Sequence, residues 1–213
     1  MTKNLASIRK EYSLKQLDEK DVKRDPFDQF KEWFDDAVNA EVKEPNAMML
    51  ATSTSDGKPS ARMVLLKGFD KEGLTFFTNF NSRKASLLDS NPCAALVFFW
   101  PELERQIRIE GIVEKVSEKE SNEYFNSRPE GSRVGAWASP QSQVIPNREF
   151  LELLYTEIET KFKGKKIPRP ERWGGFRVIP SLFEFWQGRP NRLHDRIQYS
   201  KADNNWIIER LAP

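Results

Sequence analysis

The chain has 213 residues, enough to bury the core of one large domain or of two small ones. Its 34 lysines and arginines nearly balance 32 acidic residues, so a net charge of +2 gives no broad field for nucleic acid or an acidic membrane. Cys93 is the only cysteine, which excludes an intrachain disulfide, and no apolar run approaches the roughly 18 residues of a membrane span. The first residues lack an apolar signal core, so we expect a cytoplasmic protein.

The N-terminal residues 1–25 are highly charged with few apolar positions, which predicts a mobile arm able to close over a site. Asp25 and Pro26 are typical of an N-cap and a first helical residue, and apolar spacing predicts a helix over 26–42. Short β-branched and aromatic runs then predict further elements. We expect strands at 48–54, 61–67, 74–78, 93–100 and 105–116, with helices at 82–90 and 117–126 between them.

Glycines and prolines are frequent over 128–146, which predicts a long functional loop. A helix at about 148–163, a basic linker and strands at 174–187 and 196–209 complete the chain. The pattern is mainly β with inserted helices, a barrel or an α+β fold with five to seven mostly antiparallel strands, and it favours one domain over 26–213. A dinucleotide-binding fold is excluded because GxGxxG and strict βαβ alternation are both absent.

The segment from Thr78 to Lys84 predicts a strand end, a turn and a helix start. First-turn amides, the hydroxyls of Thr78 and Ser82, and the cations Arg83 and Lys84 would suit a phosphate. The alternative is an ordinary N-cap with two solvated cations.

Two further segments carry cations on predicted strands. Arg62 and Lys67 are five residues apart and point to opposite faces of a regular strand, which suggests two separate anions unless both simply reach water. Gln106, with Arg108 and Glu110 on its face, could meet the edge of a heterocycle such as a flavin. The alternative there is a solvated face with cross-strand ion pairs.

Tyr124, Arg128 and Ser132, four residues apart, could close around a phosphate, although an arginine at a helix end is also common as a dipole partner. The only histidine, His194, lies between Arg192 and Arg196 on a turn after Trp186. A lone histidine is more often structural, but crowded cations beside aromatics suit an anionic, planar ligand. We expect His194 to lose its proton in the free protein and to regain it beside a phosphate.

Other chemistries lack their residues in this sequence. One histidine, one cysteine and no CxxC or HxxH motif give no nitrogen or sulfur metal shell. The sequence lacks the GxSxG motif of a serine hydrolase. Binding to nucleic acid would need a larger excess of basic residues.

Several motifs, in order, resemble the pyridoxine (pyridoxamine) 5′-phosphate oxidase family. They are RMVLLK (62–67), FFTNFNSRKA (76–85), YFNSRP (124–129), GAWASPQS (135–142), WGGFRV (173–178), EFWQG (184–188) and RLHDR (192–196). The likeness covers nearly the whole chain. Phe77 stands where some relatives have tyrosine, a change that backbone contacts could survive.

The resemblance implies an FMN-binding split β-barrel, in a homodimer whose two chains share each site. Carried onto matching positions, it implies cofactor contacts by Arg62, Met63, Val64, Leu65, Leu66, Lys67, Phe77, Thr78, Ser82, Arg83, Lys84, Gln106, Gln141, Ser142, Trp186 and Arg196. It implies substrate contacts by Arg9, Tyr12, Lys67, Tyr124, Arg128, Ser132, Arg192, Leu193 and His194. Arg192 and His194 would be the catalytic pair that holds the pyridine ring against the flavin.

The implied activity belongs to vitamin B6 metabolism and pyridoxine biosynthesis. A flavoprotein oxidoreductase of this kind oxidises pyridoxine or pyridoxamine 5′-phosphate with dioxygen to pyridoxal 5′-phosphate and hydrogen peroxide, with ammonia from the amine. Hydride would pass from C4′ to the flavin N5. Two alternatives stay open: a related flavin oxidase acting on a phenazine precursor, and a non-enzymatic split barrel that binds flavin or haem. The first would be expected to lack part of the substrate-phosphate residues, and the second would have no reason to keep Arg192 and His194 alongside them.

Overall fold

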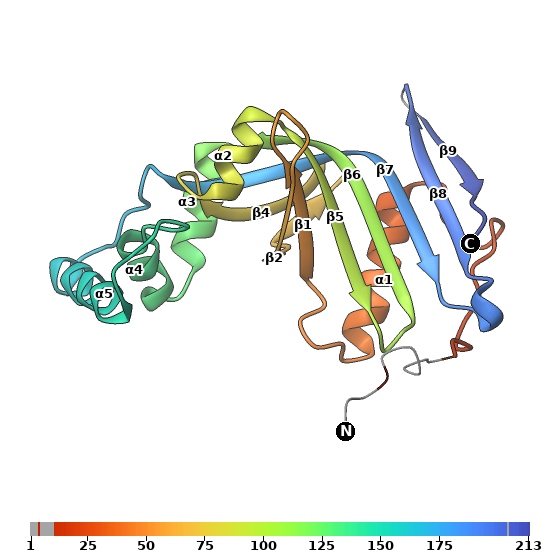
Figure 1. Cartoon of the computed structure of the whole chain (residues 1–213), viewed down its shortest axis with the longest axis horizontal. Coiled ribbons are helices and arrows are strands. Elements are labelled where there is room, and N and C mark those ends of the chain that lie inside the picture. The colour runs from red at the N-terminus through yellow and green to blue at the C-terminus, as the bar shows by residue number, and fades with distance from the viewer. Residues whose placement is uncertain (1–3, 5–10, 204) are drawn as a thin grey trace. The chain divides into compact units, whose positions relative to one another are not determined.

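The computed structural model describes residue 4, residues 11–203 and residues 205–213. Strands dominate the described chain, and the helices are inserted between them (Figure 1). The elements are α1 (Pro26–Asn39), β1 (Ala47–Ser53), β2 (Pro59–Leu65), β3 (Gly68–Asp70), β4 (Gly73–Asn79), α2 (Arg83–Ser90), β5 (Cys93–Trp100), β6 (Arg105–Lys115), α3 (Glu118–Ser127), α4 (Glu130–Ala138), α5 (Arg148–Phe162), β7 (Trp173–Gln187), the short 3-10 helix η2 (Pro190–Arg192), β8 (Asp195–Ala202) and β9 (Asn205–Arg210).

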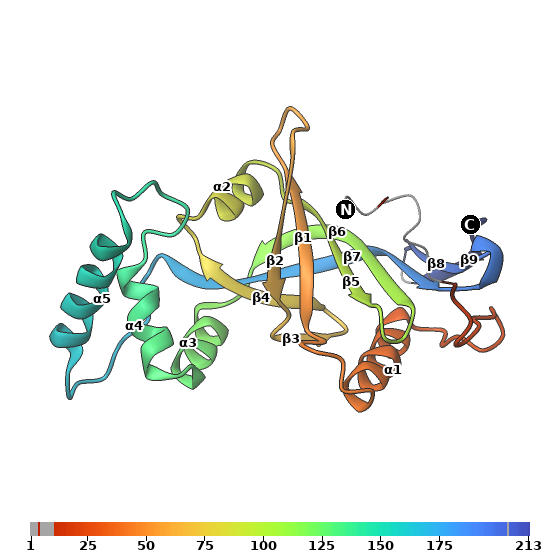
Figure 2. The ribbon, with the colours of Figure 1, turned by 60° about the horizontal axis from the view of Figure 1, so that its bottom comes forward.

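The strands join in one sheet in the order β2-β1-β5-β6-β7-β4-β3, with β8 paired to β7 and β9 to β8. The long strand β7 (Figure 2) pairs in antiparallel register with β4 over residues 173–178 and with β8 over residues 182–187. The prediction of a single strand over residues 196–209 is wrong. This segment is a hairpin of β8 and β9, and Asp203, with φ 50, lies in its turn.

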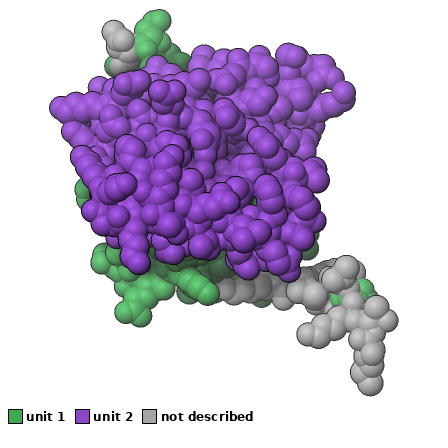
Figure 3. Space-filling view, turned by 90° about the vertical axis from the view of Figure 1, so that its left-hand side faces the viewer, with its two compact units in different colours: residues 1–50, 95–111, 180–213 green, residues 51–94, 112–179 purple. Residues whose placement is uncertain are grey.

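Two compact units make up the chain (Figure 3). Unit 1 contains residues 1–50, 95–111 and 180–213, and unit 2 contains residues 51–94 and 112–179. Each unit is assembled from segments that are separated in sequence, so composition alone offers no boundary between them. The single domain predicted over 26–213 stays a prediction.

In unit 1, the helix α1 packs its aromatic stripe on one face of the sheet. The Asp25 carboxylate caps the helix by accepting from the amide of Phe27 at 2.8 Å, as its position before Pro26 predicts. The ring of Phe27 meets Phe183 and that of Trp33 meets Phe185, both with centroids 5.2 Å apart. Side chains alternate along a strand, so the residues between these aromatics on β7 face the other side. The helix ends at Asn39, three residues before the predicted end.

In unit 2, α4 lies inside the segment predicted as the loop 128–146, so that prediction is wrong over Glu130–Ala138. The glycines and prolines that suggested a loop have other roles. A Cβ on Gly131 would lie 3.1 Å from the Tyr155 hydroxyl, so glycine lets α5 approach α4 closely. Pro129 is the N-cap residue, and Pro140 follows the end of the helix. Val134 of α4 forms a buried cluster with Phe125, Ile167 and Trp173.

Candidate functional site

Unit 2 contains a cavity of about 490 Å³ whose wall is shared by β2, the end of β4, α2, α3 and α4. Most of the site residues predicted on this half of the chain line it. They are Met63, Val64, Leu65, Lys67, Phe77, Thr78, Lys84, Tyr124, Arg128, Ser132 and Gln141. The wall also includes Asn79, Pro129 and Trp173. The predicted residues Arg62, Leu66, Ser82, Arg83 and Ser142 are not part of this lining.

One end of the cavity is polar and lies at the start of α2. The buried strand β4 ends there, and Lys84 Nζ donates to Thr78 Oγ1 at 3.0 Å. The Thr78 hydroxyl and the Asn79 amide both donate to Oε1 of Gln141, at 3.1 and 3.2 Å. Within the described chain, Ser82 makes no side-chain cap hydrogen bond at this helix. The first-turn amides of α2 are therefore left to another acceptor.

Cations crowd together around this helix start. The pKa of Lys84 is lowered by burial and by the charge of Arg62, and that of Arg62 is lowered by burial and by Arg83. Arg62 donates to the hydroxyls of Thr52 and Ser60, at 2.8 and 2.5 Å. Like charges held this close cost free energy until an anion offsets them. The arrangement is suited to bind a phosphate.

The opposite part of the cavity wall is aromatic. Phe77 stacks on Tyr124 with centroids 4.0 Å apart and lies nearly parallel to Trp173 at 5.6 Å. The Arg128 guanidinium lies 4.6 Å from the centre of the Trp173 ring. Burial lowers the pKa of Arg128, and its Nη1 is buried without a hydrogen-bond partner among the described residues. A buried guanidinium nitrogen without a hydrogen-bond partner beside a cavity favours the binding of an anion there.

Unit 1 holds a second cluster, at the end of β7. The ring of His194 lies 4.6 Å from that of Trp186, and Tyr12 meets both rings edge-on, at 5.6 Å from Trp186 and 5.9 Å from His194. Tyr12 therefore lies against the predicted catalytic segment. Arg9, its predicted partner in the arm, lies outside the described residues.

The loop that carries the predicted catalytic pair has an uncommon backbone. Asn191 and Arg192 follow each other with φ of 56 and 62, a left-handed conformation that costs a non-glycine residue free energy. The Arg192 and Leu193 side chains are exposed. The pKa of His194 is lowered by burial and then by Arg192, while Asp195 acts in the opposite direction. The predicted proton loss in the free protein agrees in direction with this shift.

Ion pairs cover the sheet face next to Trp186. Arg196 lies opposite Trp186 in the β7–β8 register and donates to Glu184 Oε1 at 2.8 Å. Glu184 is 3% exposed and also pairs with Arg108, at 3.0 Å, which in turn reaches Glu110. Gln106 is half-buried in the same strand as Arg108. The cross-strand ion pairs named as the alternative for this face are thus present.

The predicted residues consequently fall into two groups, one in each unit. Four residues that sequence reasoning gave no role belong to these groups: Asn79, Pro129 and Trp173 in the cavity wall, and Glu184 beside Arg196. All four occur inside motifs quoted above, which is the signal that could have drawn attention to them. Which cation a buried carboxylate meets depends on strand register, and the sequence does not state the register.

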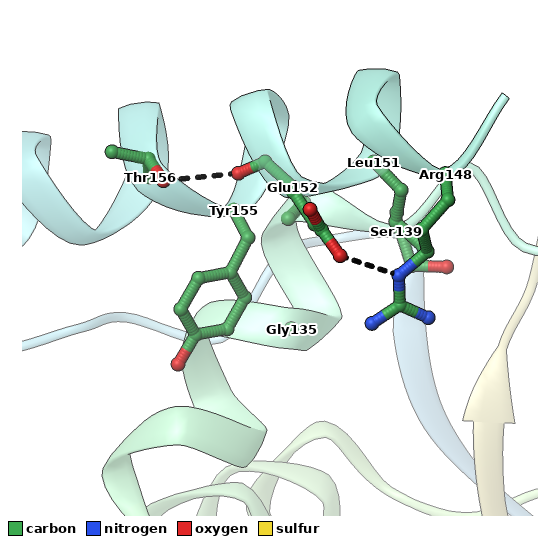
Figure 4. A pocket seen from close by; sticks show the side chains of 8 residues that line it. Gly135, Ser139, Arg148, Leu151, Glu152, Tyr155 and Thr156 are labelled. Carbon is green, nitrogen blue, oxygen red and sulfur yellow. Dashed lines mark hydrogen bonds and ion pairs between the residues drawn. The ribbon is translucent and has the colours of Figure 1, made fainter.

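A second hollow lies between α4 and α5 and includes none of the predicted site residues (Figure 4). Its one guanidinium, that of Arg148, is held by Glu152 at 2.8 Å, an exposed pair one helical turn apart. Such pairs contribute little to stability or binding. The two charged side chains of this hollow, Arg148 and Glu152, are thus paired with each other.

No trio of His, Cys, Asp or Glu side chains is arranged to hold a metal ion in the described part of the chain. In the same residues, no helix is both long and apolar enough to span a membrane.

Comparison with known families gives two matches that together cover most of the chain. Residues 34–162 match the family described as pyridoxamine 5′-phosphate oxidase. Residues 173–213 match the family described as the pyridoxine 5′-phosphate oxidase C-terminal dimerisation region. The second match contains the whole Trp186–Arg196 segment.

Curated relatives are similar over their full length. A pyridoxine/pyridoxamine 5′-phosphate oxidase of Nostoc punctiforme is 59% identical over 214 residues and 100% of both chains. Another, of Cupriavidus pinatubonensis, is 57% identical over 98% of this chain and 99% of the relative.

Solved structures show the same fold. PhzG from Burkholderia lata, solved in complex with tetrahydrophenazine-1-carboxylic acid, superposes with a TM-score of 0.87 at 34% identity, over 91% of this chain and 95% of PhzG. A pyridoxamine 5′-phosphate oxidase-related, FMN-binding protein of Nostoc punctiforme has a TM-score of 0.69 at 18% identity, over 86% and 97% of the two chains. The predicted fold class, a mainly β split barrel with inserted helices, is confirmed.

Proposed function

Because this chain belongs to the pyridoxamine 5′-phosphate oxidase family of oxidoreductases, we propose that it oxidises pyridoxine 5′-phosphate and pyridoxamine 5′-phosphate to pyridoxal 5′-phosphate. Dioxygen is the final electron acceptor and becomes hydrogen peroxide. The amine substrate also takes up one water and releases ammonia, so both reactions balance. The cofactor is FMN, and the activity belongs to vitamin B6 metabolism in the cytoplasm.

The proposal rests mainly on one observation: a single cavity contains two separate cationic groups that are suited to bind anions. Lys84 lies at the start of α2, and Arg128 lies beside Trp173 with a buried, unsatisfied Nη1. The reaction requires two phosphates in one site, one on the cofactor and one on the substrate. Lys84 and Arg128 therefore give each phosphate a separate cation on the cavity wall, and Lys67 adds a third.

The residues around α2 fit the phosphate end of FMN. Lys84, Arg62 and Arg83 supply positive charge, and Thr78 and Ser82 supply hydroxyl groups. Gln141 and the backbone of residues 63–66 would contact the rest of the cofactor. When bound, FMN supplies a two-electron acceptor for the hydride lost at C4′ and transfers those electrons to dioxygen.

Lys67, Tyr124, Arg128 and Ser132 would hold the substrate phosphate, since all four line the same cavity. The stacked pair of Phe77 and Tyr124 gives this end an apolar wall that excludes water. A fixed phosphate holds the substrate ring at one place, and even a small displacement of the reacting carbon costs rate.

The second cluster supplies the groups that act on the pyridine ring. Arg192 and His194 would cover the ring, with Leu193 beside them and Tyr12 and Arg9 closing the site from the arm. Trp186, Arg196 and Gln106 would contact the flavin. Since the dimerisation match covers residues 173–213, we propose a homodimer in which this cluster completes the cavity of the partner subunit.

An anaerobic titration tests the function. The protein is loaded with FMN, its visible spectrum is recorded without oxygen, and pyridoxine 5′-phosphate is added. We expect the flavin absorbance to bleach, then to return on admitting air with formation of pyridoxal 5′-phosphate and peroxide. Unphosphorylated pyridoxine is the matched control and should bleach the flavin far more slowly. A loaded protein that does not bleach with the phosphorylated substrate would overturn the proposal.

The likeness to PhzG favours one second candidate, oxidation of a reduced phenazine precursor. The same titration with tetrahydrophenazine-1-carboxylic acid separates the two. An Arg128→Met variant sharpens the distinction, because it should impair only the reaction of the phosphorylated substrate.

A further inference from the structure

We infer that Glu104 is a positioning residue that anchors the N-terminal arm, so that Tyr12 is held against His194 and Trp186. Glu104 is buried, with 2% of its surface exposed, and it is not among the predicted site residues. The inference deepens the proposed function and rests on it, since the residues that Tyr12 contacts are those proposed to cover the substrate.

The carboxylate of Glu104 holds the arm by its main chain. One oxygen, Oε2, accepts hydrogen bonds from the amides of Ser13 and Leu14, at 2.8 and 3.1 Å. These two amides directly follow Tyr12 in the chain. A charged acceptor strengthens both bonds and leaves little freedom in the adjoining residues.

The backbone of Glu104 holds the strand end that carries the catalytic loop. Its carbonyl accepts from the amide of Gly188 at 2.8 Å and from Nε2 of Gln187 at 3.2 Å. Gln187 is fully buried and is itself held by Arg105, whose Nε donates to the Gln187 amide oxygen at 3.0 Å. Glu104 adopts φ 53, which fits its place in the tight connection before β6. One residue thus ties the arm and the end of β7 together.

Close packing of Tyr12 over Gly188 independently supports the inference that the arm is held in place. A Cβ on Gly188 would lie 2.7 Å from Cγ of Tyr12 and 3.1 Å from Cβ of Glu104. Only glycine leaves room for the ring there. The arm is also tied further on, because the Leu17 amide donates to Asp195 Oδ2 at 3.0 Å. The contacts hold the arm to both ends of the 188–195 loop.

The first test measures amide hydrogen exchange at Ser13 and Leu14, which requires no enzymatic activity. Both amides should be protected in the wild-type protein and should exchange rapidly in Glu104→Ala. Glu104→Gln keeps an acceptor oxygen and should restore most of the protection. The exposed neighbour Glu102, changed to alanine, is the matched control and should behave as wild type. Equal protection in wild type and Glu104→Ala would overturn the anchor.

The second test separates positioning from a merely structural role by kinetics. Glu104→Ala should raise KM for pyridoxine 5′-phosphate by about tenfold, corresponding to ~1.4 kcal/mol, with FMN affinity unchanged and with recovery in Glu104→Gln. An unchanged KM, or a loss that the glutamine variant does not recover, would count against positioning. Inactivity of the wild-type protein would instead refute the proposed function and leave the exchange result standing.

A variant on the arm covers the case in which Glu104→Ala does not fold. Ser13 is exposed, so Ser13→Pro removes one donor to Glu104 without changing the core, whereas Ser13→Ala keeps the amide. We expect the proline variant to lose protection at Leu14 and to raise KM, and the alanine variant to match wild type. Equal behaviour of the two variants would contradict the inference.

Discussion

The main-chain amide of Arg189 donates a hydrogen bond to Nδ1 of His194, with 3.1 Å between the two nitrogens. An imidazole nitrogen that accepts a hydrogen bond carries no proton, so the neutral ring has its hydrogen on Nε2. Protonating Nδ1 would set two donors against each other. This contact acts in the same direction as burial and Arg192, which lower the pKa of His194.

The lowered pKa of His194 predicts a pH dependence of stability. Since its pKa is below the ordinary value of about 6.5, the unfolded chain binds the proton more readily. The stabilising contribution is therefore complete above about pH 6.5 and is lost as pH falls through the pKa of the folded protein. We expect His194→Asn, whose amide oxygen can accept from Arg189, to flatten the decline of the melting temperature below that pH. If the melting temperatures of the wild type and of His194→Asn fall in parallel as the pH is lowered, this assignment is wrong.

Changing Arg192 to alanine should leave the protein yellow while lowering turnover strongly. The side chain is exposed and next to His194 in the loop, so its removal leaves the α2 cations that we propose bind FMN. Flavin content and turnover are measured on the same preparation. Arg148→Ala, an exposed arginine on α5, serves as the control. Wild-type turnover in Arg192→Ala would exclude its proposed role over the substrate ring.

Changing Lys84 to alanine should weaken FMN binding. Its Nζ lies 3.0 Å from Thr78 Oγ1 in the crowded cationic end of the cavity. Loss of one charge-assisted hydrogen bond costs about 1.5–3 kcal/mol, so the FMN dissociation constant should rise about 10- to 100-fold. Flavin fluorescence quenching measures the constant. The exposed Lys58 provides a control by the same substitution, and an unchanged constant for Lys84→Ala would rule out the phosphate contact.

The packing of α4 on α5 predicts an interaction between Gly131 and Tyr155. Alanine favours a helix over glycine by up to ~1 kcal/mol, but a Cβ at 131 would meet the Tyr155 hydroxyl at 3.1 Å. Gly131→Ala should therefore stabilise the protein more in a Tyr155→Phe background than alone. Denaturant unfolding of the two single variants and the double variant measures the difference. Strict additivity would show that the hydroxyl does not restrict position 131.

Periodicity in the sequence predicts most strands and helices because it reflects which side chains are buried. The aromatic stripe of α1 and the alternation along β6 are examples, and both match the buried faces. The sequence does not predict the short helix α4, because it cannot distinguish a glycine such as Gly131, which packs against α5, from a glycine in a turn. The β8–β9 hairpin was missed because alternating side chains continue on both sides of its turn.

The candidate site residues are predicted mainly from motif resemblance, because the residues of each single segment also allow an ordinary structural role. Glu184 and Glu104 show why. Each is a carboxylate near the predicted site, but a partner comes from a distant part of the chain: Arg108 for Glu184, and the arm for Glu104. Such pairs depend on register and on long-range folding, which local composition does not encode.

If Arg192 covers the substrate ring as we propose, its left-handed backbone sets stability against function at one position. A non-glycine residue with φ 62 lowers the free energy of unfolding by about 1–2 kcal/mol relative to a relaxed backbone, and glycine would avoid that loss. Glycine would also remove the guanidinium. Selection for a higher melting temperature would thus favour Arg192→Gly, and the resulting protein would be more stable but would have a lower turnover. A search for thermostable variants should therefore hold this position constant.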